Sequence, residues 1–273
     1  MILLSGKEVQ DDIKKKLKEK IGGLTSVPKL VIIQVGENEQ SGIYINRKKK
    51  FGEELGITVE HKKFQEAVTE EEIIQEIEKD NQDESVGGII VQLPIPKNLN
   101  LSRVLNSIDV NKDVDGLSAG QMGLLYSGNE EAHVPATARG VISLLDYYEV
   151  NLNSKSVCVV GRSNLVGRPI AEMCLKRNAT LTICHSHTKN LEEFTRVADV
   201  LVVACGVPNY INDTHTREGQ VVIDVGIHKT DNGICGDVDF AKVKDVVSAI
   251  TPVPGGVGPL TVASLFQNLV YSA

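Results

Sequence analysis

Short, uninterrupted apolar runs rich in β-branched residues are the feature that most limits how this chain can fold. The first half holds Lys29–Val35 (KLVIIQV) and Gly87–Leu93 (GGIIVQL), and the second half holds Lys155–Gly161 (KSVCVVG) and Val221–Val225 (VVIDV). Runs of this length without polar alternation are typical of strands buried on both faces, which occur in parallel sheets covered by helices. The chain therefore predicts an α/β protein whose parallel strands are joined by right-handed crossovers.

Helical patterns separate these runs in the first half. Apolar residues four positions apart predict a first amphipathic helix, at Val9, Ile13, Leu17 and Ile21. Ser41–Leu55 predicts a second helix, which ends at Gly56, and Ile57–His61 predicts a strand after it. Thr69 and Glu72 have the spacing of a capping box at the start of a third helix. The first half therefore has a βαβαβ order.

The second half repeats this alternation and indicates a second domain. Its further predicted elements are the helices Gly140–Tyr148, Pro169–Arg177 and Thr261–Tyr271 and the strands Thr180–Cys184 and Val197–Cys205. Residues 118–135 are rich in loop residues and have no strong period, which predicts a boundary there. A length of 273 residues agrees with about two domains.

Composition excludes several classes of protein. The 29 basic and 36 acidic residues give a net charge of −7, which argues against general nucleic-acid binding and against docking on anionic membranes. No apolar stretch approaches the roughly 18 residues of a membrane span, and the N-terminus does not resemble a signal peptide. Five widely spaced cysteines without a C-x-x-C pair indicate a reducing compartment, and no zinc or other metal site is expected. Those in apolar runs, Cys158, Cys184 and Cys205, are expected to be small buried hydrophobes.

A glycine turn follows the first apolar run of the second half. The strand passes into G-R-S-N-L-V-G and then into a predicted helix. A strand, a glycine turn and a helix N-terminus form an arrangement that receives a dinucleotide pyrophosphate, because free N–H groups and the helix dipole favour anions. The full G-x-G-x-x-G pattern is absent, with only Gly161 and Gly167 present, so a tight turn in another kind of α/β protein is the alternative.

The next predicted strand, Thr180–Cys184, favours NADP over NAD. It ends in His185, Ser186 and His187 and lacks the carboxylate that would accept the ribose hydroxyls of NAD. Arg162, on the preceding turn, together with hydroxyl donors suits a 2′-phosphate, although an arginine that only points to solvent is the alternative. The two histidines do not have the spacing of metal ligands.

Polar residues gather where strands of the first half end. Tyr44 and Lys48 are one helical turn apart on the helix that follows the first strand, at the sheet edge where α/β proteins bind ligands, although a solvated lysine-rich face is the alternative. Gln92 ends the third strand, and Asp115 lies in K-D-V-D-G beside the same edge. An amine whose pKa burial can depress, a neutral hydrogen-bonding group and a carboxylate suit general acid–base chemistry. The loop TPVPGGVGP at residues 251–259 permits close approach to a flat ligand, or is a simple turn.

Seven short motifs occur in one order along nearly the whole chain: S-x-x-Y-x-x-x-K-x-K, V-Q-L-P-I-P, K-D-V-D-G, G-R-S-x-x-V-G-x-P, V-I-D-V-G-I, G-D-V-D and T-P-V-P-G-G-V-G-P. In this combination the sequence resembles the bifunctional methylenetetrahydrofolate dehydrogenase/methenyltetrahydrofolate cyclohydrolase family. The resemblance implies an N-terminal βαβ-type three-layer catalytic domain over residues 1–134 and a Rossmann-like, doubly wound parallel-sheet NADP domain over 135–258, with a cleft between them. It also implies that a C-terminal helix over 259–273 packs back on the first domain.

The resemblance implies an activity and a role for each motif residue. The expected enzyme is a cytoplasmic homodimer that oxidises 5,10-methylenetetrahydrofolate with NADP⁺ and hydrolyses the methenyl product to 10-formyltetrahydrofolate, within one-carbon metabolism and purine biosynthesis. By resemblance, Tyr44 stacks on the folate, Lys48 is the general acid/base with Gln92 as its partner, and Asp115 anchors the pterin. Further substrate contacts are expected at Leu93, Pro254, Gly255 and Gly256. Cofactor contacts are expected at Gly161, Arg162, Ser163, Ser186 and Ile227.

The sequence departs from the family pattern at four places. Pro135–Ala138 reads P-A-T-A where P-C-T-P is usual, Val110 replaces a proline, Leu117 a phenylalanine and Gln121 an asparagine. None of these departures removes a chemical group to which a role is assigned. We expect them to affect the local shape of the segment after Asp115 and the balance between the two activities.

Three other functions fit part of the pattern. A dehydrogenase without cyclohydrolase activity would not need Tyr44, Lys48 and Gln92 together. A shikimate-type dehydrogenase also pairs a lysine and an aspartate beside a nucleotide domain, but it would not explain VQLPIP or TPVPGGVGP. A nucleotide-sensing binding module would not depend on Lys48 or Asp115.

Overall fold

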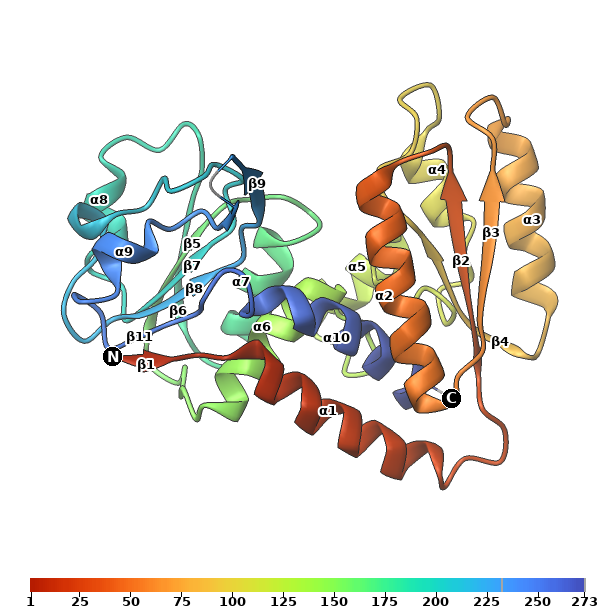
Figure 1. The fold of residues 1–273 in the computed structure, drawn as a ribbon, viewed down its shortest axis with the longest axis horizontal. Helices are drawn as coiled ribbons and strands as arrows, with labels where there is room; N and C mark the ends of the chain where they lie inside the picture. Colours follow the sequence, from red (N-terminus) through yellow and green to blue (C-terminus); the bar gives the residue numbers. More distant parts are fainter. Residues whose placement is uncertain (232, 273) are drawn as a thin grey trace. The chain divides into compact units, whose positions relative to one another are not determined.

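The computed structural model describes residues 1–231 and 233–272, which divide into two compact units (Figure 1). The three-stranded unit consists of Ile13–Ala136 and the residues from Val262 onward, and the six-stranded unit consists of Met1–Asp12 and Thr137–Thr261. Helices α1 (Gly6–Ile21) and α10 (Val257–Tyr271) have residues in both units, and so does α6 (Ala136–Tyr147) through its first residue. No helix in the described part of the chain is long and apolar enough to cross a membrane.

The three-stranded unit has a parallel sheet in the order β3 (Val59–Phe64), β2 (Lys29–Val35) and β4 (Val86–Val91). Strand β2 is central, which explains why its residues are almost all apolar and buried. Helices α3 (Glu70–Gln82) and α4 (Leu101–Asn106) pack on one face. The other face meets α2 (Glu39–Leu55) and the C-terminal part of α10, whose Phe266 ring lies 5.2 Å from that of Phe51.

Local signals place the helix ends of this unit. The side chain of Asn38 accepts the backbone N–H of Ser41 and caps α2, and the predicted capping box of Thr69 and Glu72 is present at the start of α3. Gly56 closes α2 with a φ of 73°. The predicted strand at 57–61 instead begins at Val59, because the N–H of Ile57 still bonds the carbonyl of Gly52 at the helix end.

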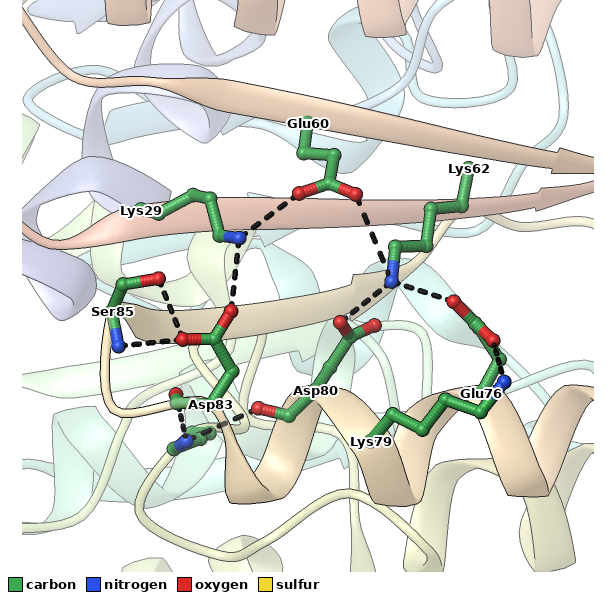
Figure 2. Close-up of polar contacts among 9 residues, drawn as sticks. Lys29, Glu60, Lys62, Glu76, Lys79, Asp80, Asp83 and Ser85 are labelled. Carbon is green, nitrogen blue, oxygen red and sulfur yellow. Dashed lines mark hydrogen bonds and ion pairs between the residues drawn. The ribbon is translucent and has the colours of Figure 1, made fainter.

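The edge strand β3 is charged, and ion pairs connect it to α3 (Figure 2). The Lys62 Nζ lies 2.7 Å from a carboxylate oxygen of both Glu76 and Asp80, two residues of α3. Glu60 of β3 also pairs with Lys29 of the central strand at 3.0 Å. Charged side chains on an edge strand discourage pairing with other chains, so this network both joins the helix to the sheet and protects the edge.

The six-stranded unit has a fully parallel sheet in the order β1-β11-β8-β7-β5-β6. Its strands are β1 (Ile2–Leu3), β5 (Ser156–Val160), β6 (Thr180–Cys184), β7 (Val200–Val203), β8 (Val221–Asp224) and β11 (Ala249–Ile250). Its shorter elements and helices are α6 (Ala136–Tyr147), α7 (Gly167–Leu175), α8 (Leu191–Thr195), η1 (Asp213–His215), the hairpin β9 (His228–Thr230) and β10 (Gly233–Cys235), and α9 (Phe240–Val243). The chain proceeds outward from β5 in one direction to β6 and in the other to β7, β8 and β11. The fold is therefore the predicted Rossmann-like, doubly wound sheet, with its switch point between β5 and β7.

The N-terminus differs from the sequence-based expectation. Residues 1–12 group with the six-stranded unit, whereas the predicted catalytic domain begins at residue 1. The reason is long-range pairing, since Ile2 and Leu3 pair with Ala249 and Ile250 and the Gly6 N–H bonds the Gly255 carbonyl at 2.8 Å. Residues from Val262 onward belong to the three-stranded unit. The functional limits 1–134, 135–258 and 259–273 stay predictions.

The segment 118–135, predicted to be a loop, contains a helix. Helix α5 spans Ala119–Tyr126, and Ser118 caps it by accepting the N–H of Gln121. Two glycines and only eight residues leave no readable period, which is why the pattern missed it. Residues 226–236, which are turn-rich in sequence, contain most of the β9–β10 hairpin.

Candidate active site

Lys48 is a buried lysine that has a hydrogen-bonding partner. Lys48 lies on α2 and is only 7% exposed, and its Nζ donates to Gln92 Oε1 at 3.0 Å. Burial lowers the pKa of Lys48, and the negative charge of Asp115 opposes this effect. The neutral amine is therefore populated at lower pH than for a solvated lysine. The neighbouring Lys50, in contrast, is exposed, as its helical position predicts.

Gln92 is held at the carboxyl edge of the sheet. Its backbone N–H bonds the Ile33 carbonyl of β2 at 2.8 Å, and its Nε2 donates to the Leu93 carbonyl at 3.0 Å. The same carbonyl accepts Ser41 Oγ at 3.3 Å, which ties the first turn of α2 to the end of β4. A polar amide at the end of a buried strand needs a hydrogen-bonding partner, and for the side-chain oxygen of Gln92 that partner is Lys48.

Asp115 and Tyr44 lie beside this pair. Burial raises the pKa of Asp115, and the charge of Lys48 opposes the rise while Asp113 adds to it. This mutual effect means that the structure brings Lys48 and Asp115 together. Tyr44, one turn before Lys48, is half-buried, and the guanidinium of Arg47 lies 5.6 Å from its ring centroid. Tyr44 therefore lies on the same helix as Lys48, at the same end of the sheet.

The segment that carries Asp115 is fastened by residues that the sequence analysis did not single out. Lys112 Nζ donates to three carbonyls at the end of α3, those of Asp80, Asn81 and Asp83, at 3.2, 2.6 and 2.9 Å. The buried Asp113 carboxylate accepts the N–H groups of Gly116 and Ser118 at 3.0 and 2.7 Å. The sequence signal for this segment was the K-D-V-D-G motif itself. Lys112 and Asp113 of the motif hold the backbone around Asp115 and so position its carboxyl group.

Two further side chains hold the same segment from other elements. His133 Nδ1 lies 2.8 Å from the Asp113 carbonyl, and Asn268 of α10 donates to the carbonyls of Val114 and Val134 at 2.8 and 2.9 Å. Asn268 is 154 residues away from Val114 in sequence, so no local pattern indicates this contact.

Two of the departures from the family pattern contact each other. Gln121 donates through Nε2 to the Val110 carbonyl at 2.6 Å and accepts the His133 N–H through Oε1 at 2.8 Å. The longer glutamine side chain therefore bridges α5 to both neighbouring segments, and the region after Asp115 is held by a buried amide whose nitrogen and oxygen are both hydrogen-bonded.

The turn after β5 is built for close backbone approach. Gly161 has a φ of 132°, and a Cβ there would lie 2.2 Å from the Ala204 carbonyl oxygen, so only glycine fits. A Cβ on Gly167 would lie 2.1 Å from the Gly161 carbonyl oxygen. Ser163 Oγ accepts the N–H groups of Val166 and Gly167 at 3.2 and 3.4 Å, which fixes the start of α7.

The residues predicted to read the phosphate lie near this turn. Arg162 and Ser186 are exposed. Partial desolvation and the positive charge of Arg162 lower the pKa of His185, which places the guanidinium near the end of β6. A cation and a hydroxyl are thus together where a ribose phosphate of a bound dinucleotide would lie.

The remaining predicted contacts lie at the ends of β8 and β11. Ile227 follows β8 and is 47% exposed, so its side chain is accessible to a ligand. The loop with Pro254, Gly255 and Gly256 follows β11, and the φ of Gly255 is 106°. Its backbone is pinned by the Gly6 N–H, as described above.

The cysteines behave as packing residues. Cys158 and Cys184 are buried as predicted, whereas Cys205 is only partly buried. Burial raises the pKa of Cys174 and of Cys205 to about 12 and that of Cys158 still further. These groups remain protonated thiols near neutral pH and are unsuited to nucleophilic chemistry.

The class of protein follows from the six-stranded unit. A switch point with a tight glycine turn is the arrangement that binds dinucleotides, so the chain is a dinucleotide-binding α/β protein with a second, lysine-bearing unit. Comparison with known families makes this specific, because the chain belongs to the tetrahydrofolate dehydrogenase/cyclohydrolase family. Residues 4–115 match the catalytic domain of that family, and residues 135–273 match its NAD(P)-binding domain.

Similar proteins cover the whole chain. A bifunctional protein FolD of Agathobacter rectalis is 45% identical over 98% of this chain and 97% of its own length. The crystal structure of the bifunctional FolD of Campylobacter jejuni has 43% identity and a TM-score of 0.97, covering 100% of this chain and 98% of its own. The Trypanosoma brucei FolD, solved with NADP cofactor and inhibitor, has 31% identity and a TM-score of 0.93 over 100% and 97% of the two chains.

Proposed function

We propose that this protein is a bifunctional enzyme that oxidises 5,10-methylenetetrahydrofolate with NADP⁺ to the methenyl derivative and then hydrolyses it to 10-formyltetrahydrofolate. The observation that carries the proposal is the buried Lys48, hydrogen-bonded to Gln92 and electrostatically coupled to Asp115. It stands in a chain that matches both domains of the family, and the similar proteins are named as bifunctional.

The residues of the six-stranded unit fit NADP. Gly161 and Gly167 allow the tight turn that leads into α7, because a Cβ on either would clash with the backbone of Ala204 or Gly161. The N–H groups at the helix start favour a pyrophosphate, and the exposed Arg162 supplies a cation for a 2′-phosphate. Ser163, Ser186 and Ile227 complete the proposed cofactor contacts. When bound, NADP⁺ accepts the hydride that the methylene carbon of the substrate gives up. The FolD of Trypanosoma brucei was solved with this cofactor, which supports the choice of NADP.

The contribution of the chain to oxidation is positioning. Hydride transfer needs two reactants held at near-attack distance, with little other chemistry from the protein. We assign Asp115 to anchoring the pterin and Tyr44 to packing against it. Leu93 and the loop of Pro254, Gly255 and Gly256 contribute backbone contacts. The fastened segment around Asp113 keeps the carboxylate of Asp115 in place while the substrate binds.

Hydrolysis is the work of Lys48. A neutral Lys48 takes one proton from water as the water oxygen bonds to the cationic methenyl carbon, which gives a neutral hydroxylated adduct. The protonated Lys48 then gives a proton to the folate nitrogen as the carbon–nitrogen bond breaks, and the hydroxyl proton is released to solvent as the formyl C=O forms. The amine donates one N–H to Gln92, which fixes the direction of its lone pair. Burial lowers the pKa of Lys48 and so makes the neutral form more accessible than in a solvated lysine, which is the direction this role requires.

We further infer a cytoplasmic homodimer that supplies one-carbon units for purine biosynthesis, with functional domains over 1–134 and 135–258 and a C-terminal helix that packs on the first. The family resemblance supports these points. Sedimentation equilibrium tests the dimer, which a monomer mass at micromolar concentration would contradict.

One assay tests the proposed function. The protein is given 5,10-methylenetetrahydrofolate with NADP⁺ or NAD⁺, and the methenyl product is followed as it forms and decays. We expect faster formation with NADP⁺ and decay faster than in buffer. No methenyl product with either cofactor would refute the proposal, and product that accumulates without accelerated decay would reduce it to a dehydrogenase alone.

A further inference from the structure

Two buried carboxylates lie beneath the carboxyl ends of β7 and β8 in the six-stranded unit. Asp237 is 0% exposed and Asp224 is 3% exposed, and neither belongs to the residues assigned above. Burying a carboxylate is costly unless several donors satisfy it, so such groups are kept where they organise the surrounding backbone.

Asp237 holds two separate turns with one carboxylate. Its Oδ2 accepts the backbone N–H groups of Cys205 and Gly206 at 2.7 and 2.9 Å, and these residues begin the turn after β7. Its Oδ1 lies 2.6 Å from Nε2 of His228, the first residue of β9, which directly follows Ile227 at the end of the turn after β8. The two turns are therefore linked through Asp237.

Asp224 fixes Asp237 in turn. Its Oδ1 accepts the N–H groups of Gly226 and Asp237 at 2.9 and 3.0 Å, and its Oδ2 accepts that of Val238 at 2.9 Å. The packing here is tight, since a Cβ on Gly226 would lie 2.4 Å from the Asp237 carboxyl group. Burial raises the pKa of Asp224 to about 6, so the carboxylate is ionised above neutral pH.

The position of these turns relates them to one half of a dinucleotide. The glycine turn, which carries Arg162, follows β5, and Arg162 lies near the end of β6. Both strands are on one side of the switch point, so we assign the adenosine 2′-phosphate to that side. A dinucleotide lies across the switch point, so its nicotinamide half reaches the ends of β7 and β8. Gly161 and Ala204, the residue before Cys205, touch at this crossing.

We propose that Asp237, together with His228, is a positioning residue that sets the two turns receiving the nicotinamide half of the cofactor. The inference rests on the proposed function, because it assumes that the six-stranded unit binds NADP. It makes no use of Arg162 and therefore concerns both NADP⁺ and NAD⁺.

The test compares three variants at pH 8, and a fourth, His228→Gln, tests for rescue. Asp237→Asn keeps the size of the side chain but replaces one accepting oxygen with an NH₂ group, and His228→Phe removes the donor on the partly exposed side of the pair. Asp239→Asn is the matched control, since Asp239 lies two residues away and its carboxylate caps α9, where it accepts the Lys242 backbone N–H and pairs with the Lys242 side chain.

We expect Asp237→Asn and His228→Phe to raise the KM for NADP⁺ and for NAD⁺ by the same factor, about tenfold or more. The Kd for NADPH, measured by fluorescence, rises in parallel. Hydrolysis of methenyltetrahydrofolate supplied directly needs no cofactor and uses Lys48 of the other unit, so it keeps the wild-type rate and reports an intact fold. His228→Gln, which retains an N–H donor, restores part of the cofactor affinity.

Each outcome decides between the proposals. A wild-type protein that binds no NADPH would contradict the proposed function itself. Wild-type binding with an unchanged NADPH Kd in both Asp237→Asn and His228→Phe would overturn the positioning role. A defect that appears only with NADP⁺ would also overturn it, because it would place the two turns at the 2′-phosphate. If Asp237→Asn loses hydrolysis through misfolding, His228→Phe alone carries the comparison.

Discussion

At the scale of single residues, the chemistry depends on how a few side chains are buried. Desolvation is the chief cause of the pKa shifts of Lys48 and Asp115: it lowers the pKa of the lysine and raises that of the carboxyl group, and so favours the neutral form of each. Lys50, on the same helix, is exposed instead.

Lys48→Met is expected to reduce methenyltetrahydrofolate hydrolysis by about 10²- to 10⁴-fold, because it removes the general acid/base while keeping a long apolar side chain. Lys50→Met, two positions away and exposed, is the control and should keep wild-type turnover. The measurement is the loss of methenyl absorbance. Retained hydrolysis in Lys48→Met would refute the role assigned to the amine.

Gln92→Glu is expected to move the pH profile of hydrolysis. A carboxylate 3.0 Å from Lys48 Nζ favours the protonated amine and therefore raises the pKa of Lys48. Hydrolysis requires the neutral amine, so the rising limb of the rate against pH shifts to higher pH. Gln92→Met removes the hydrogen bond without adding charge and should not shift the limb upward. An unmoved limb in Gln92→Glu would show that Lys48 does not set it.

Arg162→Ala is expected to raise the KM for NADP⁺ by about tenfold or more, with little effect on NAD⁺, because only the 2′-phosphate is bound by the guanidinium. Arg168→Ala is the control, since Arg168 is also exposed beside the turn but bonds Asn164 at 3.0 Å. Equal effects of Arg162→Ala on both cofactors would mean that this residue does not read the phosphate.

At the scale of elements, edge strand β3 depends on α3 for its charge balance. Burial acts to lower the pKa of Lys62, but its hydrogen bonds to Asp80 and Glu76 dominate and hold that pKa well above the usual range. Asp80 is itself buried. The stability that this ion pair contributes is therefore fully present throughout the neutral range, and it declines only as pH rises from the ordinary lysine pKa towards the raised pKa of the folded state.

Lys62→Met is expected to lower the free energy of unfolding by about 1–3 kcal/mol, because it leaves the buried Asp80 carboxylate without its main partner. Lys63→Met, on the same strand, breaks only an exposed pair with Glu37 and should cost less than about 1 kcal/mol. Urea denaturation at pH 7 measures both. Adding Asp80→Leu to Lys62→Met should recover part of the loss, and equal losses in the two single variants would contradict the assigned importance of the network.

At the scale of the whole molecule, local sequence patterns predicted some elements of the fold, whereas others depend on pairing between residues far apart in the chain. The periodic apolar runs correctly predicted the central strands, the α/β class and the helices around Lys48, because strand and helix periods are properties of neighbouring residues. Short elements such as β1 and α5 were missed, since two to eight residues carry no readable period. The family itself was predicted from seven ordered motifs and is confirmed by the matches to both of its domains.

The sequence by itself thus determined the parallel sheets, the glycine turn and the candidates Lys48, Gln92 and Asp115. Only the tertiary structure decided that Lys48 bonds Gln92, that Lys112, Asp113 and Asn268 hold the Asp115 segment, and that residues 1–12 complete the six-stranded sheet. The physical reason is separation along the chain. Burial, the pKa values that burial changes, and contacts such as Asn268 with Val114 arise from residues far apart in sequence, which no local pattern encodes.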